Sequence, residues 1–369
     1  MLPNPLRTIW LNDQKQLQVI NQTLLPHEVR VETLLNTEDV FQAIRQMIVR
    51  GAPLIGATAA YGLWMACRDA NENKLVEEIE KSADYLRDSR PTAVNLFVCI
   101  DRMMEAIRKV DGKAAKTATA LQTAHDIVEE DIEICRMIGV SGLPLIEEIS
   151  KRKDGAPVNI LTHCNAGMMG CIRWGTITSP IYQALEKGIK LHVWVDETRP
   201  RNQGSNLTAW ELTQHEVPHT LIVDNTGGHL MQHGMVDLVL VGTDRTTRRG
   251  DVANKIGTYL KALAAKDNNV PFYVCLPSTT IDWTINDGLK EIPIEERNQD
   301  EVKYIHGINS NGQADKVLIC PITTPAANYG FDVTPARLVS GFITERGVCD
   351  ASETGLLKLF PEQVLPIIE

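Results

Sequence analysis

Two residues that could move protons on a carbon skeleton follow separate apolar runs of this chain. Cys164 comes shortly after the run Val158–Leu161, and Asp244 comes shortly after the run Leu238–Val241. One of these groups could take a proton from carbon while the other delivers a proton to oxygen. Each residue also has a simpler interpretation, because an isolated cysteine is often a small buried hydrophobe and an aspartate after a strand is often a turn or capping residue.

Short apolar runs alternate with longer helical segments throughout the second half of the chain. This alternation predicts a parallel sheet with helices on both faces. Open parallel sheets bind ligands at the carboxyl ends of their strands, so the residues after these runs are expected at one edge. The predicted strands are Val158–Leu161, Leu191–Val195, Thr220–Val223, Leu238–Val241 and Phe272–Leu276, with Val317–Cys320 as a last candidate.

His163 precedes Cys164 directly and suggests a cysteine–histidine pair. Adjacent residues of a strand point to opposite faces, so we interpret His163 as structural. His229 and His233 share one helical face, but the intervening residues lack the glutamate of a metalloprotease helix. The sequence therefore indicates no metal site and no cofactor.

Anion-binding sites are predicted at several expected helix starts. Gly250–Gly257 is expected to open a helix with Asp251 as its N-cap, where free N–H groups and Lys255 would hold a phosphate. Gln203 and the two residues after it are expected to open another helix. Arg50 and Arg90 each precede turn-forming residues. None of these segments has the spacing of a Walker loop or a dinucleotide fingerprint, which disfavours ATP and NAD.

The remaining pattern predicts the domain organisation. Short β-like runs occupy the first 35 or so residues, and helical spacing then dominates from Glu38 to about Glu148. A charged, turn-rich break follows at Lys151–Pro157. We therefore predict an α/β protein with a helix-rich N-terminal domain that includes a small β element, residues 1–150, followed by a parallel-sheet domain, residues 151–369.

Composition excludes several classes of protein. The chain has 369 residues and a formal net charge of −10, which argues against a dedicated binder of nucleic acid or of an anionic membrane. The uncharged run Gly51–Cys67 contains three glycines, a proline and the hydroxyls of Thr58 and Tyr61, and is interpreted as a buried helix rather than a membrane span. Eight cysteines without a CxxC pair, and no leader-like N-terminus, predict reduced thiols and a cytoplasmic location.

Several long stretches together resemble the methylthioribose-1-phosphate isomerase family, whose distant relatives are ribose-1,5-bisphosphate isomerases and regulatory subunits of a translation-initiation exchange factor. The matching stretches span nearly the whole chain. They are Arg50–Tyr61, Arg90–Leu96, Thr162–Gly167 (THCNAG), Asp196–Leu212, Gly242–Thr258, Ile292–Arg297 and Phe331–Pro335.

The resemblance implies an aldose–ketose isomerase that converts a 5-substituted ribose 1-phosphate to the matching ribulose 1-phosphate. It also implies a Rossmann-like C-terminal domain and a homodimer. Cys164 and Asp244 become the catalytic pair, with Asp244 as the proton donor. The implied contacts with the sugar phosphate are Arg50, Gly51, Ala52, Arg90, Gln203, Asn254 and Lys255.

Some segments depart from the family pattern. Met168–Gly175 replaces a run of small residues after THCNAG, and Asn225–His229 differs after Asp224. These departures leave the 5-substituent open between methylthio and 5-deoxy, with Met168 and Met169 as candidates to line its pocket. A ribose-1,5-bisphosphate isomerase would need a second basic site, for which Arg173, Arg199 or Arg201 is available. A non-catalytic regulatory subunit that binds a sugar phosphate or a nucleotide is the third alternative, although such a protein would not need both Cys164 and Asp244.

Overall fold

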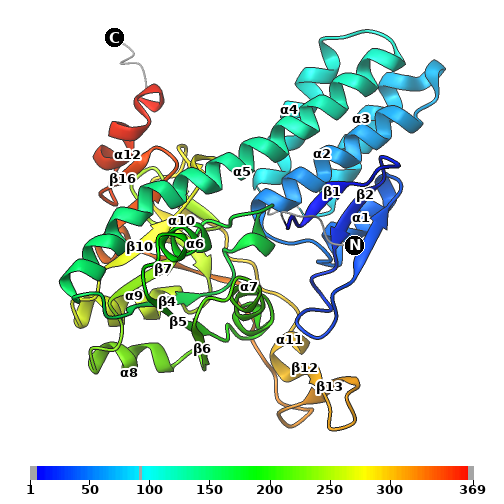
Figure 1. The fold of residues 1–369 in the computed structure, drawn as a ribbon. Helices are drawn as coiled ribbons and strands as arrows, with labels where there is room; N and C mark the ends of the chain where they lie inside the picture. The colour runs from blue at the N-terminus through cyan, green and yellow to red at the C-terminus, as the bar shows by residue number, and fades with distance from the viewer. Residues whose placement is uncertain (1–5, 91–93, 365–369) are drawn as a thin grey trace. The chain divides into compact units, whose positions relative to one another are not determined.

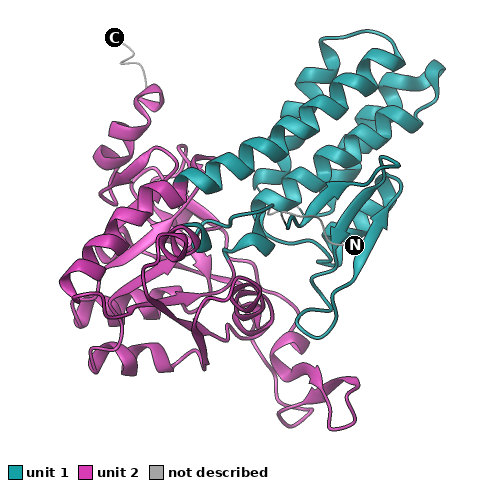
Figure 2. Cartoon of the chain, viewed as in Figure 1, with its two compact units in different colours: residues 1–137, 166–179 teal, residues 138–165, 180–369 magenta. Residues whose placement is uncertain are grey.

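A computed structural model describes residues 6–90 and 94–364 (Figure 1). Within them the chain forms two compact units, each described here by itself (Figure 2). Unit 1 comprises the described residues of 1–137 together with 166–179, and unit 2 comprises those of 138–165 and 180–369. The extreme N-terminus, on which the absence of a leader was predicted, lies outside the described residues, as does part of the stretch Arg90–Leu96.

The observed units differ from the division predicted at residues 150 and 151. Helix α5 (Lys113–Arg152) runs without interruption to the charged break, and its residues change units after Met137. The break at 151–157 therefore marks the end of a helix and not the end of a compact unit. Residues 166–179 belong to unit 1, although the residues on both sides of them in the sequence belong to unit 2.

Unit 1 combines a small antiparallel sheet with a group of helices. Its sheet has the order β1-β2-β3, which confirms the β element predicted in the first 35 residues. The strands are β1 (Ile9–Leu11), β2 (Leu17–Ile20) and β3 (Val31–Leu34). The helices are α1 (Thr37–Arg45), α2 (Ala52–Asp69), α3 (Leu75–Asp88), α4 (Val94–Arg108) and the first part of α5.

Helix α2 is the central helix of unit 1, as the uncharged sequence predicted. Every residue from Leu54 to Cys67 is buried, which is typical of a helix surrounded by other elements. A Cβ atom at Gly56 would lie 2.6 Å from the Sγ atom of Cys99 on α4, so this glycine permits close helix packing. Within the described part of the chain, no helix is both long enough and apolar enough to span a bilayer.

The segment 166–179 completes the core of unit 1. Ile172 is fully buried in the same hydrophobic cluster as α2 and the β1–β3 sheet. The backbone N–H of Thr8 donates to the carbonyl of Ile172 at 3.0 Å. The side-chain amide of Gln22 donates to the carbonyl of Met169 at 2.7 Å. The N-terminal strands are therefore held by residues that follow them by about 150 positions in the sequence.

Unit 2 contains a seven-stranded sheet of order β16-β15-β10-β7-β4-β5-β6, parallel except for β16. Its central strands are buried along their length, as expected for a parallel sheet covered on both faces. The strands are β4 (Val158–His163), β5 (Leu191–Asp196), β6 (His219–Ile222), β7 (Leu238–Val241), β10 (Phe272–Cys275), β15 (Gly341–Thr344) and β16 (Gly347–Cys349). The associated helices are α6 (Thr178–Glu186), α7 (Ala209–Gln214), α8 (Thr226–Gln232), α9 (Thr258–Asp267) and α12 (Glu353–Leu359).

Five of the six predicted strands are in this sheet, and the sixth is elsewhere. Val317–Cys320 overlaps β13 (Ala314–Leu318), which pairs with β12 (Tyr304–Ile308) in a separate hairpin. Strands β15 and β16 of the sheet were not predicted. Two short helices precede these hairpin strands, α10 (Gly288–Glu291) and α11 (Asp300–Lys303).

A second, four-stranded sheet of order β11-β8-β9-β14 lies in the same unit. Its strands are β11 (Ile281–Asp282), β8 (Arg245–Thr247), β9 (Val252–Lys255) and β14 (Phe331–Thr334). The prediction that Gly250–Gly257 opens a helix is therefore wrong. Residues 252–255 pair with β14 instead, and α9 begins only at Thr258.

Candidate active site

The strand order places a topological switch point between β4 and β7. From β4 the chain adds β5 and then β6 on one side, and then crosses to β7 on the other side of β4. The two neighbouring strands are parallel, with His163 of β4 opposite Val241 of β7. Cys164 directly follows β4 and Asp244 closely follows β7. The two predicted catalytic residues thus leave the same sheet edge at the position where open α/β sheets bind ligands.

Cys164 has a strained backbone that neighbouring side chains hold in place. Its φ angle is 68°, in the left-handed region that a cysteine rarely adopts. Its N–H donates to Thr198 Oγ1 at 2.8 Å, and its carbonyl accepts from Thr208 Oγ1 at 2.7 Å. Thr198 is itself left-handed, with φ 66°, and its N–H donates to the Asp224 carboxylate. Strain of this kind costs about 1–3 kcal/mol per residue and is concentrated at functional sites.

The residue after Cys164 is fixed by a buried carboxylate. Asn165 donates from its side-chain amide to Glu211 Oε1 at 2.7 Å and to Thr208 Oγ1 at 3.1 Å. Glu211 is fully buried and also accepts from the hydroxyl of Tyr182 at 3.5 Å. Glu211 was not predicted as a functional residue. Its only signal was its place in the family-like stretch Asp196–Leu212.

Asp244 is anchored through its backbone while its side chain is exposed. Its N–H donates to the carbonyl of Ala253 on β9 at 2.9 Å, and the Thr243 hydroxyl donates to the same carbonyl at 3.1 Å. This pairing brings Asp244 against the strand that carries Asn254 and Lys255. The structure therefore groups three of the predicted site residues at one place in unit 2.

The three residues of unit 2 that were predicted to contact the sugar phosphate differ in their hydrogen-bond partners within the chain. Gln203 is 6% exposed, and its Oε1 oxygen is buried without a hydrogen-bond partner among the described residues. The Asn254 amide donates to Thr258 Oγ1 at 3.0 Å. The Lys255 ammonium donates to the carbonyl of Gly330 at 2.9 Å and lies 4.7 Å from the centroid of the Phe331 ring. An unsatisfied buried amide oxygen is costly, which favours a ligand donor at Gln203.

The start of α9 is not the anion site that the sequence predicted. Asp332 accepts from the N–H groups of Gly257 and Tyr259 at 2.7 and 3.1 Å, so a carboxylate of this chain already occupies the helix N-terminus. Burial raises the pKa of Asp332, while these two backbone hydrogen bonds lower it. Asp251, the predicted N-cap, instead accepts from the N–H groups of Gly288 and Ala336.

The remaining predicted contacts belong to unit 1 and precede two helices that pack together. Gly51 is the N-cap of α2, whose first turn contains no acidic residue, and Arg50 comes directly before it. Arg90 lies ahead of α4, whose first residues contact α2 through Gly56. The positive end of the α2 dipole and the Arg50 guanidinium together form an environment that favours an anion.

Gly51 is constrained by both its backbone and its neighbour. Its φ angle is 90°, and a Cβ atom there would lie 2.1 Å from the carbonyl oxygen of Gly170. We expect Gly51→Ala to lower the free energy of unfolding by more than Gly112→Ala, because Gly112 has a φ angle of 77° but open space around it. The strain shared by both variants is about 1–3 kcal/mol. Urea unfolding of both variants measures the difference, and equal losses would contradict a steric role for Gly170.

A buried ionic network, which the sequence did not predict in full, connects the strand ends of unit 2. Nδ1 of His163 lies 3.0 Å from Asp196 Oδ2, and its Nε2 lies 2.8 Å from the carbonyl of Ile256. The Lys261 ammonium lies 3.1 Å from the same Asp196 oxygen and donates to the carbonyl of Asp224. His163 thus has structural partners on both ring nitrogens, in line with its interpretation as a structural residue.

Lys261 is expected to be the most sensitive member of this network. It is 4% exposed, and Asp196 is fully buried. Lys261→Met should destabilise the protein by about 3–5 kcal/mol, because it removes one partner from a buried carboxylate. Chemical denaturation measures the loss, and Lys266→Met, an exposed position on the same helix, is the control. A change of similar size in both variants would rule out the proposed buried pair.

Known proteins resemble this chain in both sequence and fold. The model of the initiation factor 2 subunit family matches residues 48–351. The chain is 56% identical to a methylthioribose-1-phosphate isomerase of Desulfosudis oleivorans, over 98% of both chains, and 58% identical to one of Rhizobium meliloti, over 96% of this chain and 97% of that one. A solved structure of 5-methylthioribose 1-phosphate isomerase from Pyrococcus horikoshii superposes with a TM-score of 0.85 at 37% identity, covering 96% of each chain. A solved structure of the translation initiation factor eIF-2B, subunit delta, from A. fulgidus superposes with a TM-score of 0.81 at 38% identity, covering 96% of this chain and 99% of that one.

Proposed function

Because the chain belongs to the methylthioribose-1-phosphate isomerases, within the initiation factor 2 subunit family, we propose that it converts S-methyl-5-thioribose 1-phosphate to the corresponding ribulose 1-phosphate. The chain is an isomerase enzyme. Its reaction serves methionine salvage. The observation that carries the proposal is the position of Cys164 and Asp244 after adjacent strands at the switch point of the sheet.

The substrate sets the chemical problem. Phosphate on the anomeric carbon prevents the ring from opening to a free aldehyde. In the proposed mechanism Asp244 protonates the ring oxygen as the bond from that oxygen to C1 breaks. Hydrogen then moves from C2 to C1. As the ketone forms at C2, the hydroxyl there gives its proton to the Asp244 carboxylate, which restores the acid. The hydrogen travels either directly as a hydride or as a proton carried by Cys164.

The phosphate contacts are part of the same proposal. Gln203, Asn254 and Lys255 of unit 2, and Arg50, Gly51, Ala52 and Arg90 of unit 1, are proposed to bind the sugar phosphate. The unpartnered Oε1 of Gln203 supports this role, because a sugar hydroxyl would satisfy it. The exposed carboxyl of Asp244 supports access of a substrate to the proton donor.

Two of the three arginines named for a second phosphate, Arg199 and Arg201, are engaged elsewhere, which favours an uncharged 5-substituent. The third, Arg173, lies over the Trp174 ring, 5.1 Å from its centroid. Arg199 donates to the carbonyls of Pro200 and Val302. Arg201 pairs with Glu301 at 2.9 Å. Burial acts to raise the pKa of Glu301, but hydrogen bonds and charge from Arg297 outweigh it and lower this pKa to about 2. These pairs argue against ribose 1,5-bisphosphate as the substrate.

Both methylthio and 5-deoxy substrates fit this argument. Met168 and Met169, which are proposed to line the pocket of the 5-substituent, are 1% and 0% exposed and pack in the apolar interior. Gly227 packs against Leu161, since a Cβ atom there would lie 2.9 Å from the leucine Cδ1. We propose that the enzyme accepts S-methyl-5-thioribose 1-phosphate and also 5-deoxyribose 1-phosphate.

The decisive experiment compares kcat/KM for S-methyl-5-thioribose 1-phosphate, 5-deoxyribose 1-phosphate and ribose 1,5-bisphosphate. We expect turnover of the first two and little turnover of the bisphosphate. Preference for the bisphosphate would overturn the substrate assignment. Absence of turnover with all three would instead favour a regulatory protein that binds without catalysis.

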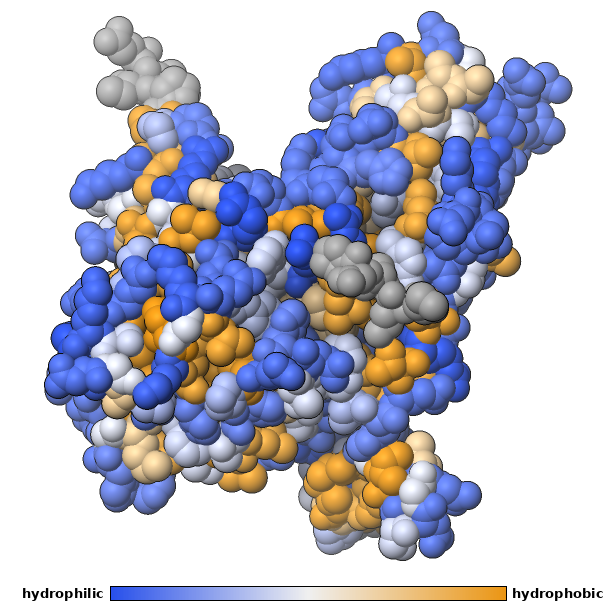
Figure 3. Space-filling model, in the orientation of Figure 1, coloured by the Kyte–Doolittle hydropathy of each residue, from blue (hydrophilic) through white to orange (hydrophobic). Residues whose placement is uncertain are grey.

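We also propose a homodimer. Hydrophobic residues gather at the β12–β13 hairpin and the segment after it (Figure 3). Val317 of β13 and the following Ile319 and Ile322 are 56%, 52% and 60% exposed. Exposed apolar patches of this kind are typical of interfaces. Light scattering on the purified protein should give twice the chain mass of 41.0 kDa, and a mass equal to one chain would contradict the proposal.

A further inference from the structure

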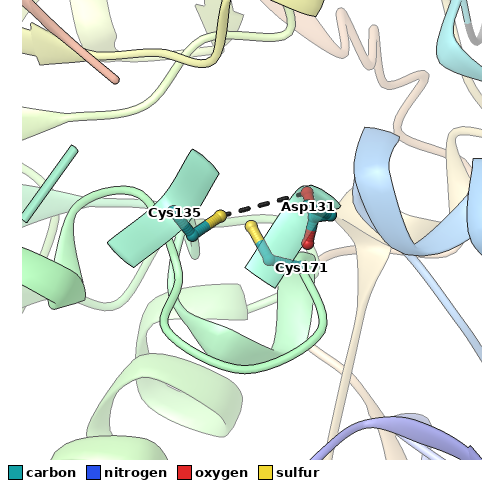
Figure 4. A group of neighbouring side chains, drawn as sticks. All are labelled: Asp131, Cys135 and Cys171. Carbon is teal, nitrogen blue, oxygen red and sulfur yellow. Dashed lines mark hydrogen bonds between the residues drawn. The ribbon is translucent and has the colours of Figure 1, made fainter. Parts of the chain in front are cut away.

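Unit 1 contains a cluster of metal-ligating side chains that the isomerase chemistry does not use. Asp131 and Cys135 lie one turn apart on α5, and Cys171 comes from the segment 166–179 (Figure 4). One donor atom from each residue lies within 4.8 Å of the donors of the other two. This cluster could not be predicted from local sequence, because Cys171 is distant from Asp131 and Cys135 along the chain and no CxxC pair is present.

The environment of the cluster is unusual for an ionisable group. Cys135 is fully buried and Cys171 is 2% exposed. The Asp131 residue is partly exposed, but its Oδ2 oxygen is buried and has no hydrogen-bond partner among the described residues. Figure 4 marks a long side-chain hydrogen bond of 3.9 Å, from Cys135 Sγ to Asp131 Oδ1. Burial raises the pKa of Asp131 to about 7, although hydrogen bonds from the backbone N–H of Ile172 and from the Cys135 thiol act to lower it.

We propose that Asp131, Cys135 and Cys171 form a binding site for a thiophilic divalent cation of the Zn²⁺ class. Such an ion would be bound by two thiolates and one carboxylate, and the two thiols would each release a proton to solvent on binding. A tetrahedral ion with bonds of about 2.3 Å to sulfur separates its two sulfur ligands by about 3.8 Å, which is within the spacing of the cluster. The buried Oδ2 of Asp131 would then have a partner.

The ligand set selects the class of cation. Two sulfur donors disfavour Mg²⁺ and Ca²⁺, which prefer oxygen ligands, and favour Zn²⁺ or its analogues Co²⁺ and Cd²⁺. The bound ion would connect α5 to the segment 166–179. Thr8 already fixes this segment by donating from its hydroxyl to the carbonyl of Cys171 at 2.8 Å. A bound ion would therefore help to fix the segment 166–179 within unit 1. This segment includes Gly170, which packs closely against Gly51.

Cobalt provides a direct probe, because a thiolate bound to Co²⁺ gives a charge-transfer absorption band. The reduced, full-length protein is titrated with Co²⁺, and we expect saturation at one ion per chain with the bands of a tetrahedral thiolate site. Cys135→Ser and Cys171→Ser should weaken binding by more than the about 10–100-fold that loss of an outer-shell partner causes. Asp131→Asn, which preserves the shape of the side chain, should weaken binding as well.

Two further variants serve as matched controls. Cys164→Ser removes the proposed catalytic thiol and Cys320→Ser removes a partly exposed thiol, and both should retain the cobalt band. A second measurement covers variants that fold poorly: Zn²⁺ should raise the Tm of the unmodified protein and of Cys320→Ser, but not that of Asp131→Asn. The proposal is overturned if the unmodified protein gives no thiolate band, or if the band survives Cys171→Ser and disappears in Cys164→Ser.

Discussion

Replacing Asp244 with asparagine is expected to lower kcat by about 10²–10⁴-fold, the usual effect of losing one positioned acid. The amide keeps the shape of the side chain but has no proton to give to the ring oxygen of the substrate. The fold should be unaffected, because the side chain is exposed and the backbone hydrogen bond to Ala253 is retained. Steady-state kinetics together with thermal unfolding separate the two effects.

The matched control for this variant is Asp267→Asn, an exposed aspartate at the end of α9. It makes the same chemical change away from the switch point and should leave kcat unchanged. A kcat for Asp244→Asn close to that of the unmodified enzyme would remove Asp244 from the chemistry, whatever the substrate.

Cys164→Ser is expected to have the second large effect, a loss of kcat of about 10²–10⁴-fold. Serine is close to cysteine in size and would adopt the same left-handed backbone conformation at similar cost. The substitution therefore removes chiefly the thiol group. The hydrogen bonds to Thr198 and Thr208 involve the backbone of Cys164 and should persist. Cys320→Ser is the control, and kcat similar to the unmodified enzyme in both variants would exclude a role for the Cys164 thiol.

Reaction in D₂O then distinguishes the two routes of hydrogen transfer. A proton carried by Cys164 exchanges with solvent, so deuterium would appear at C1 of the product. A direct hydride shift leaves C1 free of solvent deuterium. Incorporation that is lost in the residual activity of Cys164→Ser would identify the thiol as the carrier.

The sequence predicted the elements whose signals are local. Apolar runs such as Leu238–Val241 are buried on both faces in the sheet, so composition and length were enough to identify them. The stretch Gly250–Gly257 misled because glycine, asparagine and lysine are compatible with a helix start. Its strand depends on pairing with Phe331–Thr334, some 75 residues later, and no local pattern carries that information.

The residues of the candidate site also differ in how far local sequence predicts them. The position of Cys164 and Asp244 at one sheet edge could be predicted, because strand ends are visible in the sequence and parallel strands share an edge. Lys261, Glu211 and Asp332 could not, because each has a role that depends on a partner distant in sequence. Buried charges of this kind resemble ordinary surface residues until the fold provides their partners.

The place of residues 166–179 in unit 1 has a consequence for the order of events during synthesis. A ribosome releases the β1–β3 sheet and α2 long before Ile172, yet the core of unit 1 includes Ile172. The N-terminal unit therefore cannot finish folding when its first 137 residues emerge, although domains generally fold in order from the N-terminus. Strand β4 and Cys164 are already outside the ribosome when residues 166–179 emerge. The nascent chain must keep an incomplete core soluble during that interval, and a truncation before residue 166 would leave it so permanently.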